Sequence, residues 1–335
     1  MSTSTEGRTT DAGRARVRTV RLGPDLVVGG ARVPVIAAPR RGADAVHVSL
    51  RTRRGGDDAP EELTRLRRDV AAPLLVEPSC VDDLPAIGAL ADAVVIGAES
   101  AGDAPLATAV GRLGLPVVVY RAPEATVDDW LACAERVRAE ADHAEAGRAG
   151  GVGSIVLADG GVIRGGDGRV DLDLATLAEA RRRSGLPVVA DVGTSPELAA
   201  AAVAAGADAV WLAESARPAA VDRAVEVVAL VTPLVREAQR ATLAQCREAI
   251  DAVDATLAAL LERRAALAGQ VQRLKPVGGH AGRDAQREAD IVRAMAVRAP
   301  SLGHESLARI MEAVISAGLD LAEREHPTDP PVWRL

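Results

Sequence analysis

Short apolar runs rich in β-branched residues alternate with amphipathic stretches rich in Ala, Leu and Arg from about residue 33 to residue 214. Such alternation is typical of strands that are each followed by a helix. The runs are VPVIAA (33–38), AVHVSL (45–50), PLLVE (73–77), DAVVIG (92–97), PVVVY (116–120), SIVLA (154–158), PVVAD (187–191) and AVWLA (209–213). Eight of them predict a TIM-like (β/α)8 barrel, an α/β fold, with a doubly wound parallel sheet as the alternative.

Two connections in this region depart from a regular barrel. Only PRRGAD (39–44) separates the first two runs, which is too short for the usual crossover helix. Either the first helix has been lost, or the first strand is wrongly placed. The glycine-rich segment GGVIRGGDGR (160–169) does not have phosphate-loop spacing, so we expect a flexible loop rather than a nucleotide site.

The pattern changes to helical spacing in the last hundred residues. Apolar residues predict one long helix over about 233–274, which Pro276 and the following glycines end. Asp284 is the expected N-cap of a second helix to about residue 298, and a third covers 304–325. The first helix would be roughly 60 Å long at about 1.5 Å per residue, more than a small bundle can cover. A partner chain is therefore expected, in a homodimer or a larger homo-oligomer formed through the helical domain.

Four parts follow from these patterns. We predict a disordered tail at 1–20, the barrel at 21–232, an all-α domain at 233–325 and an irregular tail at 326–335. The first residues include no apolar core segment, so we do not expect them to be a signal peptide.

Composition narrows the function classes. The chain has 335 residues, a net charge of −7 and no apolar run near the 18 or so residues that span a bilayer. We therefore expect neither a membrane protein nor a dedicated nucleic-acid-binding protein. The three cysteines are far apart and form no CxxC pair, which indicates neither a disulfide framework nor a zinc site and favours the cytoplasm.

The long helix places basic residues on one face. Lys275 is the single lysine of the chain, and it lies 11 residues after Arg264. At about 100° per residue the two side chains fall within roughly 20° of one another. Arg247, 17 residues before Arg264, projects about 100° away from it.

The second helix adds acidic groups. Asp284, Arg287 and Glu288 lie at i, i+3 and i+4 and therefore share a face. Together with the basic residues they predict a cationic pocket that contains a carboxylate and suits an organic dianion. The alternative is an arginine-rich solvated surface with helical ion pairs.

The segment CREAIDAVDATLAALLERRAALAGQVQRLK, followed by GRDAQREADIV, resembles the AroQ-type chorismate mutases over about residues 240–325. Members of this family fold as three helices, which agrees with the all-α domain predicted at 233–325. The residues that match active-site positions of the family are Arg247, Arg264, Lys275, Asp284, Arg287 and Glu288.

The resemblance implies the rearrangement of chorismate to prephenate in the shikimate pathway of aromatic amino acid biosynthesis. This pericyclic reaction requires no metal, cofactor, nucleophile or proton transfer. Arg264, and Arg247 supplied across a homodimer interface, would hold the two carboxylates of the substrate. Lys275 would donate to the ether oxygen as charge develops there.

The resemblance also assigns the remaining groups. Asp284 and Glu288 would hold the substrate hydroxyl, and Arg287 would assist a carboxylate. The third helix departs from the family, because Gly318 and Ala322 occupy the positions of a usual Ser and Gln. The Gln is a second donor to the ether oxygen, and losing one such donor typically costs about 3 to 4 kcal/mol of barrier.

The barrel half resembles the short 3-deoxy-7-phosphoheptulonate (DAHP) synthases through LLVEPSCVDDLPAIGALADAVVIGAES and GLPVVADVGTSPELAAAAVAAGADAVWLAES. The metal-binding Cys, His and Glu of that family are replaced by Arg40, Thr194 and Ala213. Tyr120 replaces a substrate-binding lysine, and the adjacent Arg121 is kept. A barrel without these ligands should lack DAHP synthase activity and act as a scaffold or regulatory module.

Other polar residues of the barrel have weaker signals. His47 and His143 offer no paired metal spacing, so we expect surface or strand-end histidines. Four arginines near predicted strand ends could hold an anion but more simply form a solvated rim: Arg40, Arg51, Arg53 and Arg121.

Two alternative functions remain open. A 4-amino-4-deoxychorismate mutase of specialised metabolism performs the same rearrangement on the amino analogue. A non-catalytic partner of another shikimate-pathway enzyme would also explain the lost residues. The segment RDAQRE follows the mutase pattern rather than that of the isochorismate-pyruvate lyases.

Overall fold

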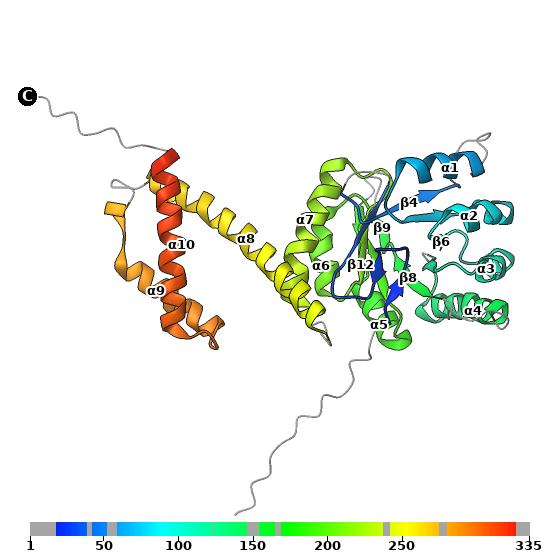
Figure 1. The fold of residues 1–335 in the computed structure, drawn as a ribbon. Helices are drawn as coiled ribbons and strands as arrows, with labels where there is room; N and C mark the ends of the chain where they lie inside the picture. The colour runs from blue at the N-terminus through cyan, green and yellow to red at the C-terminus, as the bar shows by residue number, and fades with distance from the viewer. Residues whose placement is uncertain are drawn as a thin grey trace, which may run out of the picture. The chain divides into compact units, whose positions relative to one another are not determined.

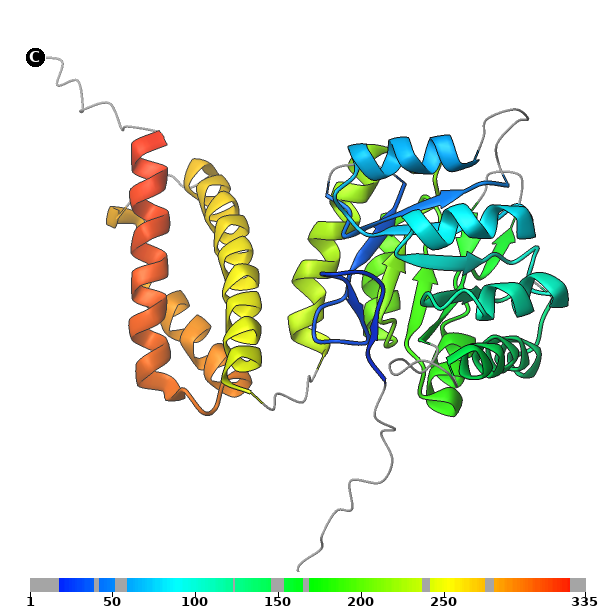
Figure 2. The ribbon, with the colours of Figure 1, turned by 45° about the vertical axis from the view of Figure 1, so that its right-hand side comes forward.

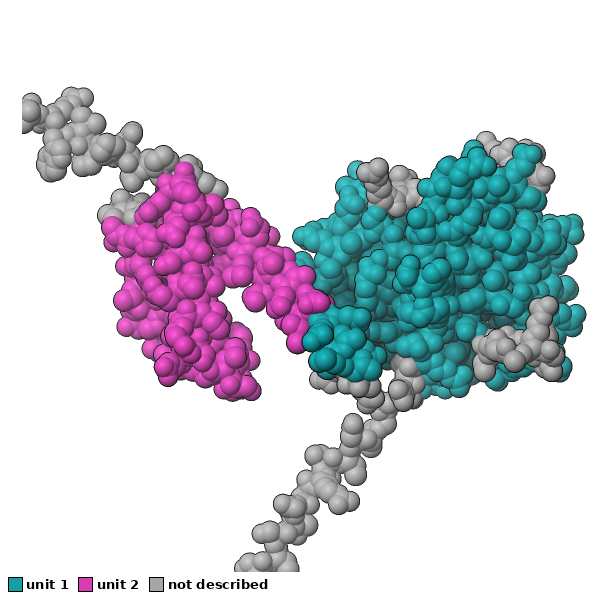
Figure 3. All heavy atoms as spheres, in the orientation of Figure 1, with its two compact units in different colours: residues 1–249 teal, residues 250–335 magenta. Residues whose placement is uncertain are grey.

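The computed structural model describes residues 18–38, 42–51, 59–122, 124–145, 154–164, 169–236, 242–274 and 280–325. The chain divides into two compact units, residues 1–249 and 250–335 (Figure 3). The tail predicted at 326–335 lies outside the described residues, as does most of the tail predicted at 1–20. The last residue of that predicted disordered tail, Val20, is ordered instead, because it is buried and begins strand β1.

Eight parallel strands close into a barrel in the first unit (Figure 1). The strands are β3 (Val35–Ala37), β4 (Ala45–Ser49), β5 (Leu74–Glu77), β6 (Ala93–Ile96), β7 (Val117–Tyr120), β8 (Ile155–Asp159), β11 (Val188–Asp191) and β12 (Ala209–Trp211). Seven of them lie within the predicted apolar runs, and β8 extends one residue beyond its run, to Asp159. Closure of β12 onto β3 confirms the barrel and excludes the doubly wound sheet.

The short first connection joins two neighbouring strands of the barrel. Strand β3 pairs in parallel with β4, with Ile36 opposite Ala45, so the first strand was placed correctly. Asp44 secures this short link, since its carboxylate accepts a hydrogen bond of 2.8 Å from the backbone N–H of Val35.

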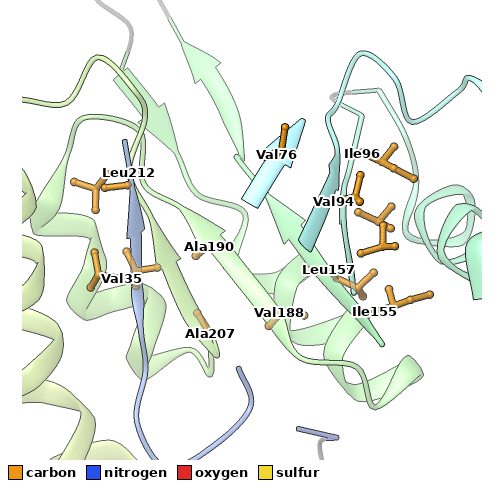
Figure 4. Close-up of a cluster of buried hydrophobic side chains, with 14 of the residues drawn as sticks. Val35, Val76, Val94, Ile96, Ile155, Leu157, Val188, Ala190, Ala207 and Leu212 are labelled. Atoms are coloured by element: carbon orange, nitrogen blue, oxygen red, sulfur yellow. The ribbon is translucent and has the colours of Figure 1, made fainter. Parts of the chain in front are cut away.

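Helices surround the barrel and bury its outward-facing side chains. They are α1 (Ala59–Asp69), α2 (Leu84–Leu90), α3 (Ala104–Gly111), α4 (Val127–Glu145), α5 (Leu174–Ser184), α6 (Ala199–Ala204) and α7 (Pro218–Val235), with short 3-10 turns η1 (Val81–Asp83) and η2 (Pro196–Leu198). Alternate strand residues such as Val94, Ile96 and Leu157 pack in this outer layer (Figure 4). Burial on both faces explains why the strands are continuous apolar runs.

The inward-facing side chains form a second core. It includes Val95, Val118 and Trp211, and Leu22 and Val28 belong to the same cluster. Leu22 and Val28 come from an antiparallel hairpin, β1 (Val20–Arg21) with β2 (Val27–Val28). The hairpin therefore adds its apolar side chains to the interior of the barrel.

His47 differs from its prediction as a surface or strand-end residue. It lies in the middle of β4, and its ring packs edge-on against Trp211 with 4.6 Å between ring centroids. Its Nε2 atom is buried and has no hydrogen-bond partner. Burial lowers the pKa of His47 to about 4. The prediction was wrong because strand alternation directs residue 47 inward, as it does Ala45.

The glycine-rich segment also differs from its prediction. Residues 162–164, expected in a flexible loop, form strand β9 (Val162–Arg164), which pairs antiparallel with β10 (Arg169–Asp171). Gly161 allows the chain to turn into β9, because its φ is 63°, a value that favours glycine, and a Cβ there would lie 2.3 Å from the carbonyl oxygen of Asp171.

The second unit is helical. Its elements are α8 (Leu243–Leu274), of which the first residues belong to the first unit, η3 (His280–Gly282), α9 (Ala285–Arg298) and α10 (Gly303–Glu325) (Figure 2). The second and third helices begin and end within one residue of their predicted bounds. None of the described helices is long and apolar enough to cross a membrane.

The first of these helices begins later than predicted. Pro233 lies inside α7, whose Val228 and Thr232 are buried. Helix α8 starts at Leu243, where Thr242 and Gln245 exchange hydrogen bonds of 3.1 and 3.2 Å in a capping box. The prediction was wrong because helical spacing continues on both sides of the break, and spacing alone did not separate two helices.

Candidate active site

A pocket of about 110 Å³ opens among the helices of the second unit. It is lined from α8 by Arg264, Ala268 and Gln272, from η3 and the residue after it by Gly282 and Arg283, from α9 and its N-cap by Asp284, Arg287, Glu288 and Ile291, and from α10 by Ile315 and Leu319. The lining therefore combines charged side chains with apolar ones.

The polar wall is built by the start of α9. Asp284 is the N-cap, as predicted, and its side chain accepts a hydrogen bond of 3.0 Å from the backbone N–H of Arg287. The cap sets the direction of the first helical turn. Residues Arg287 and Glu288 in that turn therefore both line the pocket.

Arg264 comes from the middle of α8 and lies against α10. Its Nη1 atom is 3.5 Å from the carbonyl oxygen of Val314. Gly318 is buried beside it, and a Cβ built there would lie 3.7 Å from Nη1 of Arg264 and 4.0 Å from Cβ of Ala268. The guanidinium group thus occupies the space next to the glycine that replaces the expected serine.

The arginines of the pocket differ in their partners. Among the described residues, no carboxylate forms an ion pair with Arg264 or Arg287. Arg283, in contrast, binds the carboxylates of both Glu288 and Glu312. The hydrogen bonds from Arg283 lower the pKa of Glu312 and, in return, raise the pKa of Arg283. Two cationic groups are therefore available to an anionic ligand, while a third is neutralised.

Four of the six predicted site residues meet in this pocket: Arg264, Asp284, Arg287 and Glu288. Arg247 does not, because it is exposed in the second turn of α8, about 26 Å along the helix from Arg264. Lys275 lies outside the described residues. The single-chain pocket thus contains only part of the predicted set.

Sequence reasoning missed Arg283 and Glu312. Arg283 precedes an N-cap, so it has no helical spacing to the other residues, and Glu312 is on another helix. The motif GRDAQRE contained Arg283, but nothing in it indicated a role. Ala322, at the position of the usual Gln, is buried and is not among the lining residues.

At the mouth of the barrel, aromatic side chains fill the interior. The hydroxyl group of Tyr120 donates to Asp191 at 2.9 Å, and its ring packs edge-on against Trp211 at 5.4 Å. Burial raises the pKa of Asp191, and burial together with that carboxylate raises the pKa of Tyr120. Burial also raises the pKa of Glu77, whose Oε1 atom is 3.9 Å from Nε of Arg51.

The predicted rim arginines are paired where they are described. Arg51 contacts Glu99 at 3.0 Å, and Arg121 contacts Asp159 at 2.8 Å with both side chains buried. Arg121 is therefore not a solvated rim residue, since its partner holds it in the interior. Arg40 and Arg53 lie outside the described residues. No group of three or more His, Cys, Asp or Glu side chains within the described part could hold a metal ion.

Comparisons with known proteins relate the two parts of the chain to different proteins. Residues 246–323 match the family model for chorismate mutase type II. None of the curated proteins matches the chain.

Among solved structures, a phospho-2-dehydro-3-deoxyheptonate aldolase (DAHP synthase) from Thermotoga maritima is similar, with a TM-score of 0.53 and 21% identity over 65% of this chain and 73% of that one. A truncated form of the 3-deoxy-D-arabino-heptulosonate 7-phosphate synthase from the same organism gives a TM-score of 0.50 and 22% identity, over 64% of this chain and 90% of that one. The C-terminal part of this chain thus matches the chorismate mutase type II family, and the N-terminal part has the fold of a DAHP synthase.

Proposed function

We propose that the helical unit rearranges chorismate to prephenate. The observation that supports this function is a pocket lined by Arg264 and Arg287, which have no carboxylate partner in the described part of the chain, and also by Asp284 and Glu288. Chorismate carries two carboxylates and a hydroxyl group, so this combination of cations and acceptors suits it. The family match over residues 246–323 supports the same substrate.

The proposed mechanism is geometric and electrostatic. Arg264 and Arg287 bind carboxylates and keep the substrate in its folded, reactive conformer. Glu288 and Asp284 accept from the hydroxyl group and set the orientation of the ring. Lys275 donates to the ether oxygen, where negative charge develops as the carbon–oxygen bond breaks. Donors aimed at the developing charge lower the barrier, and the rearrangement needs no proton transfer.

A second copy of the chain would complete the site. Apolar side chains of α8 are exposed to solvent in one chain, including Leu257, Leu260 and Leu267, each about half exposed. An α-helix of 32 residues is about 48 Å long, and such a face is stabilised when another chain covers it. We propose a homodimer through α8, in which Arg247 of one chain reaches the pocket of the other.

The barrel, we propose, lacks DAHP synthase activity and serves as a scaffold or regulatory module. Thr194 and Ala213 offer neither an imidazole nor a carboxylate where that family has metal ligands. Tyr120 is engaged with Asp191, and Trp211 fills the interior beside it. This proposal is tested by adding phosphoenolpyruvate, erythrose 4-phosphate and Mn²⁺ to the full chain, where any product formation would contradict it.

The test of the mutase is the consumption of chorismate by the purified full-length chain, with prephenate identified as the product. Arg264→Ala and Lys275→Ala should each lose orders of magnitude in turnover. Arg263→Ala is the matched control, because Arg263 is the neighbouring exposed arginine of α8 and does not line the pocket. Near-native turnover in both site variants would refute the assignment.

The same assay separates the alternatives. Turnover of 4-amino-4-deoxychorismate in place of chorismate would identify the amino analogue as the substrate. Inactivity on both, with no binding of a bicyclic dicarboxylate analogue of the transition state, would favour a non-catalytic partner of another shikimate-pathway enzyme.

A further inference from the structure

We propose that Arg283 is a positioning residue that orients Glu288 toward the substrate, with Glu312 as its anchor on α10. The inference rests on the proposed function, because the orientation of Glu288 matters only if that carboxylate receives the substrate hydroxyl.

The geometry is a double fork around one guanidinium group. Nε and Nη2 of Arg283 donate to the two carboxylate oxygens of Glu288 at 3.0 and 2.6 Å. Nη1 and Nη2 donate to the two oxygens of Glu312 at 2.8 and 2.6 Å. Both oxygens of Glu288 are thus engaged from one side, which fixes the plane of its carboxylate.

The position of Arg283 is itself held at both ends. After it, Asp284 caps α9. Before it, the backbone N–H of His280 donates to Glu323 at 2.9 Å, and Nε2 of His280 lies 2.9 Å from Oδ1 of Asp320. The turn η3 is therefore attached to α10, and the guanidinium group is delivered between α9 and α10.

Charge explains why a cation is needed between Glu288 and Glu312. Glu288 and Glu312 converge on one cation, so without Arg283 two carboxylates would face each other beside a pocket for a dianion. Their repulsion would turn Glu288 away from its present direction. Arg283 is also the pocket arginine that these carboxylates neutralise, which distinguishes it from Arg264 and Arg287, whose charges remain available to the substrate.

The experiment measures kcat and KM for chorismate in the full chain, with the midpoint of thermal unfolding recorded for each variant. Arg283→Ala should lower kcat by roughly 10- to 100-fold, since a displaced group beside the reacting atoms has that effect. Arg283→Lys, which keeps the charge but cannot form two forks, should recover only part of the loss. Arg283→Lys also serves if Arg283→Ala does not fold.

A double variant separates orientation from charge. Arg283→Ala combined with Glu312→Gln removes one positive and one negative charge, so the net charge near the pocket is restored while the fork is not. We expect it to recover only the part of kcat that the repulsion between the two carboxylates costs, and to stay below the wild type because Glu288 still lacks its two hydrogen bonds from Arg283. Recovery of wild-type kcat in this double variant, or full activity in Arg283→Lys, would overturn the positioning role.

Arg293→Ala is the control. Arg293 pairs with Asp290 on the exposed surface of α9, the helix that contains Glu288, and does not line the pocket. It should leave kcat unchanged. A wild-type chain that consumes chorismate, with Arg283→Ala equally fast, would refute this inference alone. A wild-type chain that does not consume chorismate would refute the proposed function and the inference with it.

Discussion

The buried histidine of the barrel should make the stability of this protein depend on pH. The ring of His47 lies inside the barrel against Trp211, and its pKa is lowered from 6.5 to about 4 by burial. In the unfolded chain the same ring takes up a proton near pH 6.5, whereas in the folded barrel it does so only near pH 4. The unfolded state therefore binds more protons between these values, and stability falls as the pH is lowered through them.

The size of the effect follows from the shift. A difference of one pKa unit corresponds to about 1.4 kcal/mol, so a shift from 6.5 to about 4 corresponds to a loss of about 3 kcal/mol once the pH is below both values. At pH 5 the loss should be about 2 kcal/mol. Glu77 and Asp191 act in the opposite direction, because burial raises their pKa values and protonation at low pH relieves the cost of their charge.

The substitution His47→Leu isolates the histidine. Urea unfolding at pH 7, 6, 5 and 4, followed by the fluorescence of Trp130 and Trp211 in the barrel, gives the free energy of unfolding for both proteins. At pH 7 the variant should be at least as stable as the wild type, because the unpartnered Nε2 atom is gone.

Subtracting the free energy of unfolding of the wild type from that of the variant removes the contribution of the carboxylates, because both proteins contain them. Relative to the wild type, the variant should gain about 3 kcal/mol between pH 7 and pH 4. Two curves that remain parallel over this range would show that His47 is not kept neutral by the barrel.

Three further predictions concern single contacts. Arg236→Ala should destabilise the barrel by about 2 to 4 kcal/mol in chemical unfolding, because the fully buried Asp208 loses a partner 2.9 Å away, and unchanged stability would contradict this. Tyr120→Phe should lower the free energy of unfolding by about 1.5 to 3 kcal/mol at a pH where Asp191 is ionised. The loss should be smaller at low pH, where protonation of Asp191 removes the charge-assisted hydrogen bond, and a loss that does not change with pH would contradict this. Gly318→Ser should fold normally and raise the midpoint of thermal unfolding, because serine has the higher helix propensity and a Cβ there would lie 3.7 Å from Nη1 of Arg264, an ordinary contact. A lowered midpoint would show that α8 and α10 lie closer together.

Local patterns in the sequence determined most of the elements. The eight strands were predicted because burial on both faces requires continuous apolar runs, and that requirement acts on each run separately. The start of α9 was predicted because Asp284 caps the backbone of a residue only three positions away. The break between α7 and α8 was missed, since the capping box of Thr242 and Gln245 carries a weaker signal than the helical spacing around it.

The tertiary structure decided what local patterns left open. Whether the first strand was correctly placed was settled by its pairing with β4 and β12, which are far apart along the chain. The environment of His47 depends on Trp211 from the opposite end of the barrel sequence. The pairing of Arg283 with Glu312 joins residues 29 positions apart. Such contacts depend on how whole elements pack, because burial and charge pairing belong to neighbours in space, which sequence spacing specifies only within a single helix or strand.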